Sequence, residues 1–290
     1  MLIVQSRSTD VYRNLAMEEW LLDHAPELPL LYLYVNDPCV VIGKNQNPWR
    51  ECRLSLMEKE GVLLARRISG GGAVYHDSGN LNVSVMVDRT EYVERKQYDL
   101  IFQTLETMAA LHNLSILGKN SLGIDGLKFS GQAFCHRRGR SLHHGTILVN
   151  ADLKRLGRYL GPEVEGIETR AVASVPAKVA NLSEYAPELT VKKLSDALIE
   201  KFQEMYGSCG VPECWSDVEI EKNCAATQLL PIIGKISSND WKLGHTPRFF
   251  FHPPSPDGFR ETGGVEVQKG RVVGLDGAPL FAEWLSARQL

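Results

Sequence analysis

The sequence has little of what marks a membrane, secreted or fibrous protein. None of its 290 residues belongs to an apolar run of about 18 residues, so we expect no transmembrane helix. Its six cysteines include no CxxC pair, which argues against a disulfide scaffold. Cys209 and Cys214 lie close together, but no second pair of ligands follows at zinc-site spacing. We therefore expect ordinary thiols in a reducing compartment.

The first twenty residues also lack the features of a targeting segment. Their apolar start is too short for the hydrophobic region of a signal peptide, and acidic residues follow where a transit peptide would be rich in arginine. This predicts a cytoplasmic protein, or a protein of the mitochondrial matrix if the source is a eukaryote.

An excess of positive charge is lacking as well. Lysine and arginine number 32 against 35 aspartates and glutamates, which gives a formal net charge of −3. No overall basic field attracts nucleic acid or anionic lipid, so neither is expected as a partner. Any site for an anion must be local. The remaining composition, 43% hydrophobic and 23% charged, is that of an ordinary globular protein.

The length exceeds that of a typical single domain, and one segment is suited to join two domains. Apolar residues recur at helical spacing between Thr190 and Tyr206, with Thr190 as a predicted N-cap and Gly207 as the end of the helix. The stretch "GSCGVPEC" that follows is rich in glycine, proline and serine. We place the boundary there, between a domain of residues 1–207 and a small α+β domain of residues 208–290.

Hydrophobic periodicity predicts most of the regular elements. Apolar or alternating runs predict strands at 30–35, 39–43, 81–87 and 144–150, and helical spacing predicts helices at 14–24 and 96–113. Residues 56–65 read as a helix running into a strand, and residues 246–254 and 263–277 as short strands and turns. Glu18 and Glu19 are predicted to form a solvated face of the first helix.

Three consecutive glycines form the most unusual local feature, in "ARRISGGGAVYHDSGNLN". Glycines allow positive φ angles and a close approach of a ligand to the backbone, whose N–H groups can then converge on an anion. The run has neither a following GK[ST] nor GxGxxG spacing, so a plain loop stays an alternative. Arg66 and Arg67 add fixed charge suited to phosphate or carboxylate. His76 and Asp77 are expected to build the turn before the next strand.

A second block, "GLKFSGQA", places Lys128 in an apolar stretch with glycines on both sides. One interpretation is a solvated lysine. The other is a compact positive charge delivered to a reacting phosphoryl or carboxyl oxygen. Further along, Arg137, Arg138 and Arg140 form a basic group that is either a solvated loop or a docking point for an acidic domain.

Five blocks together carry a specific resemblance. "VVIGKNQNPWREC", "ARRISGGGAVYHDSGNLN", "GLKFSGQA", "HHGTILVNADL" and "ASVPAKVANLSE" stand in the order and spacing of the family of lipoate-protein ligase A and mitochondrial lipoyltransferase. The resemblance covers roughly residues 1–207. "SSNDWKLGHTPRF" resembles the opening of that family's accessory domain, which is shorter here.

The resemblance implies a fold and an activity. The fold is the α+β fold of biotin and lipoate protein ligases, a mixed, largely antiparallel sheet packed with helices, followed by the small α+β accessory domain. The activity is ATP-dependent ligation with Mg²⁺: lipoate or octanoate becomes lipoyl-AMP, and the acyl group passes to a lysine. The acceptors would be lipoyl domains of 2-oxoacid dehydrogenase E2 subunits and the glycine-cleavage H protein.

The resemblance also assigns roles to residues. Lys128 would be the catalytic residue, in contact with both the lipoate carboxylate and the α-phosphate of ATP. The adenylate would be held by Arg67 and by the backbone of the loop, at Gly72, Ala73, Val74 and Tyr75. Besides Lys128, the residues assigned to lipoate are Arg66, Ser69, Gly71, His144 and Gly145. Asn82 resembles the polar residue that closes the loop. Neither a metal ligand nor a general base is assigned.

Two rival functions remain open. One is a lipoyltransferase that starts from lipoyl-AMP or a lipoylated carrier without activating lipoate itself, and Pro176, where bacterial ligases usually have arginine, favours it. A cysteine thioester mechanism is disfavoured because residues 146–208 contain no cysteine. The other rival is a non-catalytic binding module, against which the retention of Lys128 and Arg67 argues.

The short accessory domain leaves room for a separate accessory protein. The sequence does not distinguish lipoate from octanoate, name the preferred acceptor or give the oligomeric state.

Overall fold

The computed structural model describes residues 1–207, 213–216, 219, 226–253, 264–274, 277 and 279–287. The chain forms two compact units, and each is built from three separate segments. The first unit contains residues 1–38, 76–153 and 176–233, and the second contains residues 39–75, 154–175 and 234–290. The domain boundary predicted after residue 207 falls beside residues 208–212, which lie outside the described part, and it stays a prediction. Cys209 and Cys224 also lie outside it.

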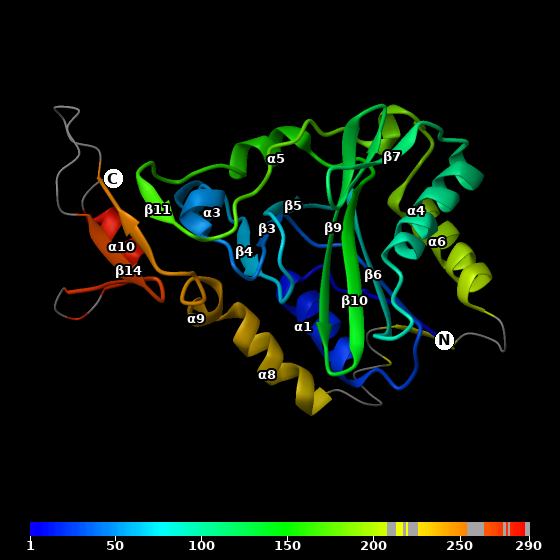
Figure 1. Ribbon diagram of the computed structural model, residues 1–290, viewed down its shortest axis with the longest axis horizontal. Helices are drawn as coiled ribbons and strands as arrows, with labels where there is room; N and C mark the ends of the chain where they lie inside the picture. The colour runs from blue at the N-terminus through cyan, green and yellow to red at the C-terminus, as the bar shows by residue number, and fades with distance from the viewer. Residues whose placement is uncertain are drawn as a thin grey trace. The chain divides into compact units, whose positions relative to one another are not determined.

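An eight-stranded sheet forms the centre of the first unit (Figure 1). Its strands stand in the order β12, β1, β2, β6, β10, β9, β8 and β7. Pairing is parallel from β12 to β2 and antiparallel in every pair from β2 onward, as the predicted largely antiparallel sheet requires. The strands span Leu2–Gln5 (β1), Leu30–Tyr34 (β2), Asn80–Asp88 (β6), Leu114–Leu117 (β7), Ser121–Ile124 (β8), Leu127–Arg137 (β9), Arg140–Leu148 (β10) and Glu213–Ser216 (β12).

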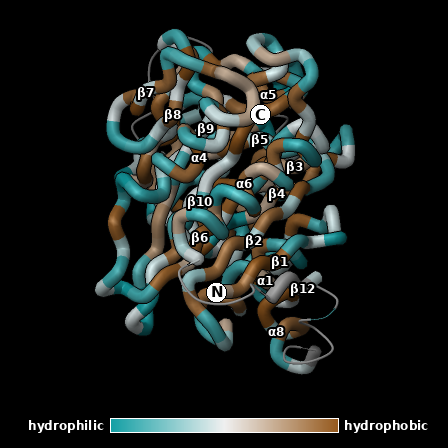
Figure 2. The backbone as a smooth tube through the Cα atoms, turned by 90° about the vertical axis from the view of Figure 1, so that its right-hand side faces the viewer, coloured by the Kyte–Doolittle hydropathy of each residue, from teal (hydrophilic) through white to brown (hydrophobic). Residues whose placement is uncertain are grey.

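Helices cover both faces of this sheet. Helix α1 (Val11–His24) lies on one face, and α4 (Glu94–Ala109) and α6 (Val191–Tyr206) pack with the main hydrophobic core on the other. Thr190 caps α6 by accepting a hydrogen bond from the N–H of Lys193, which confirms the predicted N-cap. In Figure 2 the tube is brown along β1 and β2, where the buried apolar residues of the strands lie.

The prediction for the acidic residues of the first helix is wrong. Glu18 is 1% exposed and Glu19 is 7% exposed, so neither forms a solvated face. The residues from Asn14 to Leu22 are all buried, because α1 is covered on almost every side. A helix in that environment has no polar stripe from which burial can be predicted.

The second unit is built on two smaller sheets. One has the order β4 (Leu63–Arg66), β3 (Cys39–Ile42) and β5 (Val74–His76), and the other joins β11 (Ile167–Thr169), β13 (Phe249–Phe251), β14 (Val265–Gln268) and β15 (Arg271–Val272). The short strands predicted after residue 245 are therefore confirmed where the structure describes them. Trp49 packs against Phe249 and Phe281 in the core of this unit.

Short helices complete both units. They span Pro48–Glu51 (α2), Leu54–Lys59 (α3), Leu153–Tyr159 (α5), Leu182–Glu184 (η1, a 3-10 turn), Ala226–Ser237 (α8), Asn239–Lys242 (α9) and Phe281–Ser286 (α10). Among the described residues, no helix has both the length and the apolar character needed to cross a bilayer.

Candidate active site

Lys128 is fixed in place by its backbone. Its N–H donates to the carbonyl of Lys178 at 2.9 Å, and its carbonyl accepts the N–H of Ala180 at 3.0 Å. Its half-buried side chain lies over Gly131 of the same strand, where a Cβ would stand 3.2 Å from the Lys128 Nζ. Glycine at position 131 thus leaves room for the ammonium group on the face of β9.

Small and polar residues extend from Lys128 across the same face of the sheet. Gly131 pairs with Thr146 of β10, Thr146 with Asn82 of β6, and Asn82 with Tyr34 of β2. The Asn82 amide donates to the Tyr34 carbonyl at 3.2 Å. Because paired residues in a sheet point to one side, this row forms a polar band on the side of the sheet that α1 covers. Asn82 therefore belongs to a strand rather than to the loop.

A buried contact between Glu18 and His144 lies one row further along the strands. The His144 Nδ1 is 2.9 Å from the Glu18 Oε1, which also accepts hydrogen bonds from Ser84 Oγ at 2.5 Å and Tyr34 OH at 3.3 Å. Burial raises the pKa of Glu18, but the charge of His144 and these hydrogen bonds outweigh it, so the pKa lies below its usual value. The carboxylate of Glu18 is therefore ionised and fixes the orientation of His144.

Position 145 faces the opposite side of the sheet. A Cβ at this position would stand 2.3 Å from the Nε2 of Gln132, whose side chain covers the glycine. The neighbouring His143 points to the same face and packs against Tyr98 of α4. Burial lowers the pKa of His143 to about 3, so its imidazole is neutral. Gly145 thus shapes the strand that carries His144, and its role toward lipoate stays a prediction.

In the second unit, Arg67 holds the glycine loop from within. Its guanidinium donates to the carbonyls of Gly70 at 2.6 Å and Gly72 at 2.8 Å, and to the Ser69 hydroxyl at 3.0 Å. Gly71 has φ +88°, a conformation that favours glycine. With two loop carbonyls turned toward Arg67, the conformation of the loop is set by protein contacts.

Ser174 holds the other side of the loop. Its hydroxyl accepts the N–H of Ala73 at 2.9 Å and the side-chain amide of Gln46 at 3.0 Å. Its own N–H donates to the Glu51 carboxylate at 3.0 Å. The loop continues into β5, where the Tyr75 ring is buried against Tyr159, so of Tyr75 only the backbone is suited to meet a ligand. Neither Ser174 nor Gln46 stands out in the sequence, because the contacts that join them to the loop are made only in the folded chain.

Arg66 makes its contacts with the protein itself. The guanidinium is buried and donates to three backbone carbonyls. The distances are 3.2 Å to Gly43, 2.8 Å to Gln46 and 2.6 Å to Lys242. Burial lowers its pKa to about 10. These bonds join the chain after β3 to the end of α9 within the second unit. A contact between Arg66 and lipoate stays a prediction.

Asp77 confirms the predicted turn. Its carboxylate accepts the N–H of Gly79 at 2.9 Å and that of Asp152 at 2.8 Å. His76 accepts a 2.9 Å hydrogen bond at its Nδ1 from the side-chain amide of Asn36, if the ring carries its proton on the other nitrogen. Both side chains therefore fix local structure.

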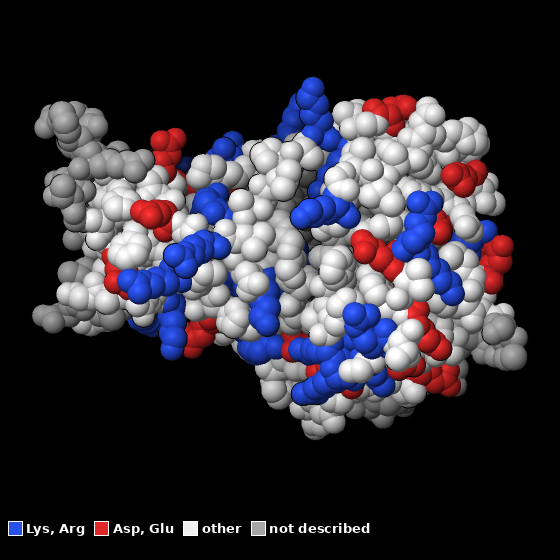
Figure 3. Space-filling model, in the orientation of Figure 1, with Lys and Arg blue, Asp and Glu red and all other residues white. Residues whose placement is uncertain are grey.

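Two arginines of the basic group on the β9–β10 hairpin make ion pairs within the protein. Arg137 makes a bidentate ion pair with Asp23 of α1, with contacts of 2.7 and 2.5 Å, and Arg138 approaches the same carboxylate at 3.2 Å. In the orientation shared by Figures 1 and 3, a group of lysine and arginine side chains lies at the lower ends of these strands. The ion pairs make this hairpin less suited to dock an acidic partner than the sequence alone suggests.

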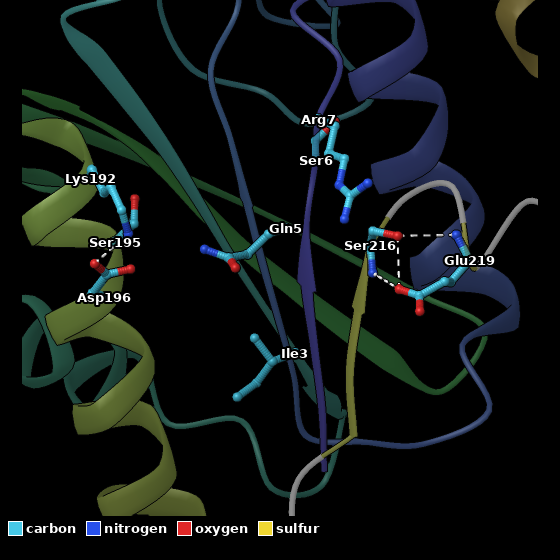
Figure 4. Close-up of a pocket in the computed structure, with 9 residues that line it drawn as sticks. All are labelled: Ile3, Gln5, Ser6, Arg7, Lys192, Ser195, Asp196, Ser216 and Glu219. Carbon is cyan, nitrogen blue, oxygen red and sulfur yellow. Dashed lines mark hydrogen bonds and ion pairs between the residues drawn. The ribbon is translucent and has the colours of Figure 1, made fainter.

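The first unit also has an open cavity of about 670 Å³ between β1 and α6 (Figure 4). Charges of both signs line it, and Lys192 is paired with Asp196 at 2.8 Å. None of the predicted site residues lines this cavity. We assign it no part in the chemistry.

A metal site is not apparent in the described part of the chain. No three side chains of histidine, cysteine, aspartate or glutamate gather there in a way that would hold an ion. Magnesium bound to a nucleotide is held mainly by phosphates and water. Mg²⁺ stays a prediction.

Comparison with known proteins defines the class of this chain. Residues 10–203 match the family described as "Lipoyl protein ligase A/B catalytic domain". The chain therefore belongs to that family of lipoate ligases and transferases, and it is an enzyme of that family.

Individual relatives carry two different names. The chain is 38% identical over 253 residues to the lipoate-protein ligase A of Psychrobacter cryohalolentis, covering 86% of this chain and 74% of the relative. It is 36% identical over 283 residues to the mitochondrial lipoyl amidotransferase LIPT1 of Mus musculus, covering 93% of this chain and 74% of the relative. Both ligases and amidotransferases are thus similar to this chain.

Solved structures confirm the predicted fold. The structure of P. falciparum LipL1 in complex with lipoate has a TM-score of 0.72 at 29% identity, covering 88% of this chain and 81% of that one. A bipartite lipoate protein ligase of Thermoplasma acidophilum shares the fold with a TM-score of 0.68 at 24% identity, covering 83% of this chain and 95% of that one.

Proposed function

We propose that the protein is an ATP-dependent lipoate-protein ligase. The observation that carries the proposal is the placement of Lys128, whose ammonium lies over Gly131 at one end of the polar band. The glycine loop, set by Arg67 and Ser174, is the proposed binding element for the adenylate through the backbone of Gly72 to Tyr75. Mg²⁺ is expected to accompany the nucleotide.

In the first half-reaction a carboxylate oxygen of lipoate attacks the α-phosphorus of ATP. The bond from that phosphorus to the bridging oxygen breaks, and pyrophosphate leaves with the electron pair. Negative charge builds up on the α-phosphate as this happens. The role proposed for Lys128 is to neutralise that charge and to orient the carboxylate.

In the second half-reaction the ε-amine of an acceptor lysine attacks the carbonyl carbon of lipoyl-AMP. The carbon–oxygen bond to the phosphate breaks, AMP leaves, and the amine loses a proton as the amide forms. Lys128 is suited to polarise the carbonyl. The general base for the amine has no assigned residue.

The polar band and the pair of Glu18 and His144 form the proposed path of the acyl chain. Thr146 and His144 lie two residues apart on β10, about 7 Å along the strand. An acyl chain whose carboxylate meets Lys128 would pass Thr146 and reach His144. The LipL1 structure, solved with lipoate, supports a lipoate-binding function for a chain of this fold.

One observation favours the second candidate, a lipoyltransferase without its own activation step. The mouse amidotransferase aligns over more of this chain than the bacterial ligase does, 93% against 86%. Pro176, two residues after Ser174, also favours this candidate, because bacterial ligases usually have arginine at that position.

The acceptors proposed are lipoyl domains of E2 subunits and the H protein. The archaeal lipoylation system of Thermoplasma acidophilum comprises a bipartite ligase and its E2 lipoyl domain, which supports a lipoyl domain as the type of acceptor. The compartment stays the prediction made from the sequence.

A direct assay tests the function. We expect the protein, incubated with ATP, Mg²⁺, lipoate and an apo lipoyl domain, to raise the mass of the domain by one lipoyl group. Omitting ATP should abolish the increase, and supplying lipoyl-AMP instead should restore it. An increase with lipoyl-AMP but none with ATP and lipoate would contradict the ligase and establish the transferase.

A further inference from the structure

The buried charge of Arg66 has no carboxylate partner in the described part of the chain. Besides the contacts given above, its guanidinium donates to the carbonyls of Lys44 and Trp241 and to the Thr246 hydroxyl, at 2.9 to 3.0 Å. All of these acceptors are neutral oxygens. They satisfy the N–H groups but do not cancel the charge, and an uncompensated buried cation is costly.

A lysine and a histidine lie close to the same point. Trp241 donates from its indole N–H to the Arg66 carbonyl at 2.7 Å. The Lys235 Nζ lies 4.8 Å from the centre of the Trp241 ring system, and the His245 ring lies 4.5 Å from it. Lys235, His245 and Arg66 therefore gather around one tryptophan.

The titration of His245 agrees with this concentration of positive charge. Burial lowers the pKa of His245, and the charges of Arg66, Lys44 and Lys235 lower it further. Every charged group that contributes to the shift is basic. The acidic residue closest to them in the sequence, Asp240, is exposed in the first turn of α9. We call Lys44, Arg66, Lys235 and His245 the Arg66 cluster.

The Arg66 cluster adjoins the glycine loop. The Lys44 N–H donates to the Ser69 carbonyl at 2.8 Å. The preceding Gly43 lies so close to the loop that a Cβ there would stand 2.3 Å from the Gly71 carbonyl oxygen. Lys44 thus extends from the segment that packs directly on the loop, and its side chain is exposed.

We propose that the Arg66 cluster is the subsite for the β- and γ-phosphates of ATP and for pyrophosphate as it leaves. This rests on the ATP-dependent activation proposed above. Lys44 and Lys235 would contact the phosphates. The buried guanidinium of Arg66 would not touch them, but its positive charge would attract them electrostatically. A polyanion is the ligand that such a concentration of like charge favours. The site would act only in the first half-reaction, because lipoyl-AMP has no β-phosphate.

The test compares the two half-reactions in Lys44→Ala and Lys235→Ala. Loss of one charge-assisted contact should raise the KM for ATP in lipoate-dependent ATP–pyrophosphate exchange by about tenfold in each variant. Transfer from preformed lipoyl-AMP to an apo lipoyl domain should stay within about twofold of the parent, because the proposed contacts are to groups that lipoyl-AMP lacks. Lys59→Ala, an exposed lysine of α3, is the matched control and should change neither.

Binding of pyrophosphate to the full-length protein by calorimetry gives a measure that needs no turnover. Both variants should bind pyrophosphate about tenfold more weakly than the parent, and AMP equally well. Unchanged pyrophosphate binding, or an equal loss of transfer from lipoyl-AMP, would overturn the proposal. A parent protein that transfers from lipoyl-AMP but shows no exchange would instead contradict the ligase function, and pyrophosphate binding would still decide on the subsite.

Discussion

At the scale of single residues, Glu18 is a buried charged group whose environment bears on stability. It is buried on α1 and accepts hydrogen bonds from Ser84 and Tyr34 beside its ion pair with His144. We expect Glu18→Gln to lower the free energy of unfolding at pH 7 by about 3 kcal/mol, because it replaces a buried carboxylate that accepts hydrogen bonds from three side chains with a neutral amide. Urea denaturation measures this.

The same variant carries a pH signature. The folded-state pKa of Glu18 lies below its unfolded value, so its contribution is complete above about pH 4.5 and is lost as the pH falls through the folded-state pKa. The stability difference between parent and Glu18→Gln should therefore shrink in acid. Glu106→Gln, an exposed residue of α4, should leave the stability unchanged at every pH. A difference that stayed constant down to pH 3 would show that the ionised carboxylate of Glu18 is not its source.

The charged residues of the proposed site were partly predictable from the sequence. Lys128 stands out because glycines lie on both sides of it, and the loop stands out because it has three consecutive glycines. The Lys128 side chain needs the space that the missing Cβ of Gly131 leaves. Glu18 did not stand out, since the partners that justify its burial lie 66 and 126 residues further along the chain. Side chains that are buried through such distant contacts leave no local pattern.

At the scale of elements, the glycine loop depends on a segment about 100 residues away. We expect Ser174→Ala, which removes the acceptor for the Ala73 N–H, to raise the KM for ATP about fivefold, the effect of one net hydrogen bond of about 1 kcal/mol. ATP–pyrophosphate exchange measures it. Ser174→Thr keeps a hydroxyl and should recover most of the affinity.

The control for this prediction is Val175→Ala, the adjacent residue, whose side chain is 86% exposed. It should leave the KM for ATP unchanged. If Ser174→Ala lowered only the melting temperature and left the KM as in the parent, Ser174 would support the fold without positioning the loop.

Most elements were predictable, and the exceptions have a physical reason. The helix after Thr190 and the strand at 81–87 follow clear periodicities and were found. Strand β9 was not, because Lys128 and Gly131 interrupt its apolar pattern, and a register shift occurs where it pairs with β8. Helix α2 was not predicted either. Asn47 as N-cap and Pro48 in the first turn mark its start, but four residues are too few to show a helical period.

At the scale of the whole molecule, the chain passes back and forth between its two units. Residues 39–75 belong to the second unit, and residues 76–153 return to the first. Local composition predicts linkers such as the stretch after Gly207. It does not predict that each compact unit is built from segments that are separate in the sequence. The five blocks of the resemblance predicted the family because their order survives that exchange.

The proposed activity depends above all on the Lys128 ammonium, which would neutralise charge as lipoate joins AMP. The most direct measurement is formation of lipoyl-AMP from ATP and lipoate by Lys128→Ala, compared with Lys178→Ala, an exposed lysine whose backbone pairs with Lys128. We predict at least about a hundredfold loss for Lys128→Ala, as for other charge-stabilising donors, with an unchanged melting temperature. Lys178→Ala should match the parent. Formation of lipoyl-AMP by Lys128→Ala at the parental rate would contradict the account.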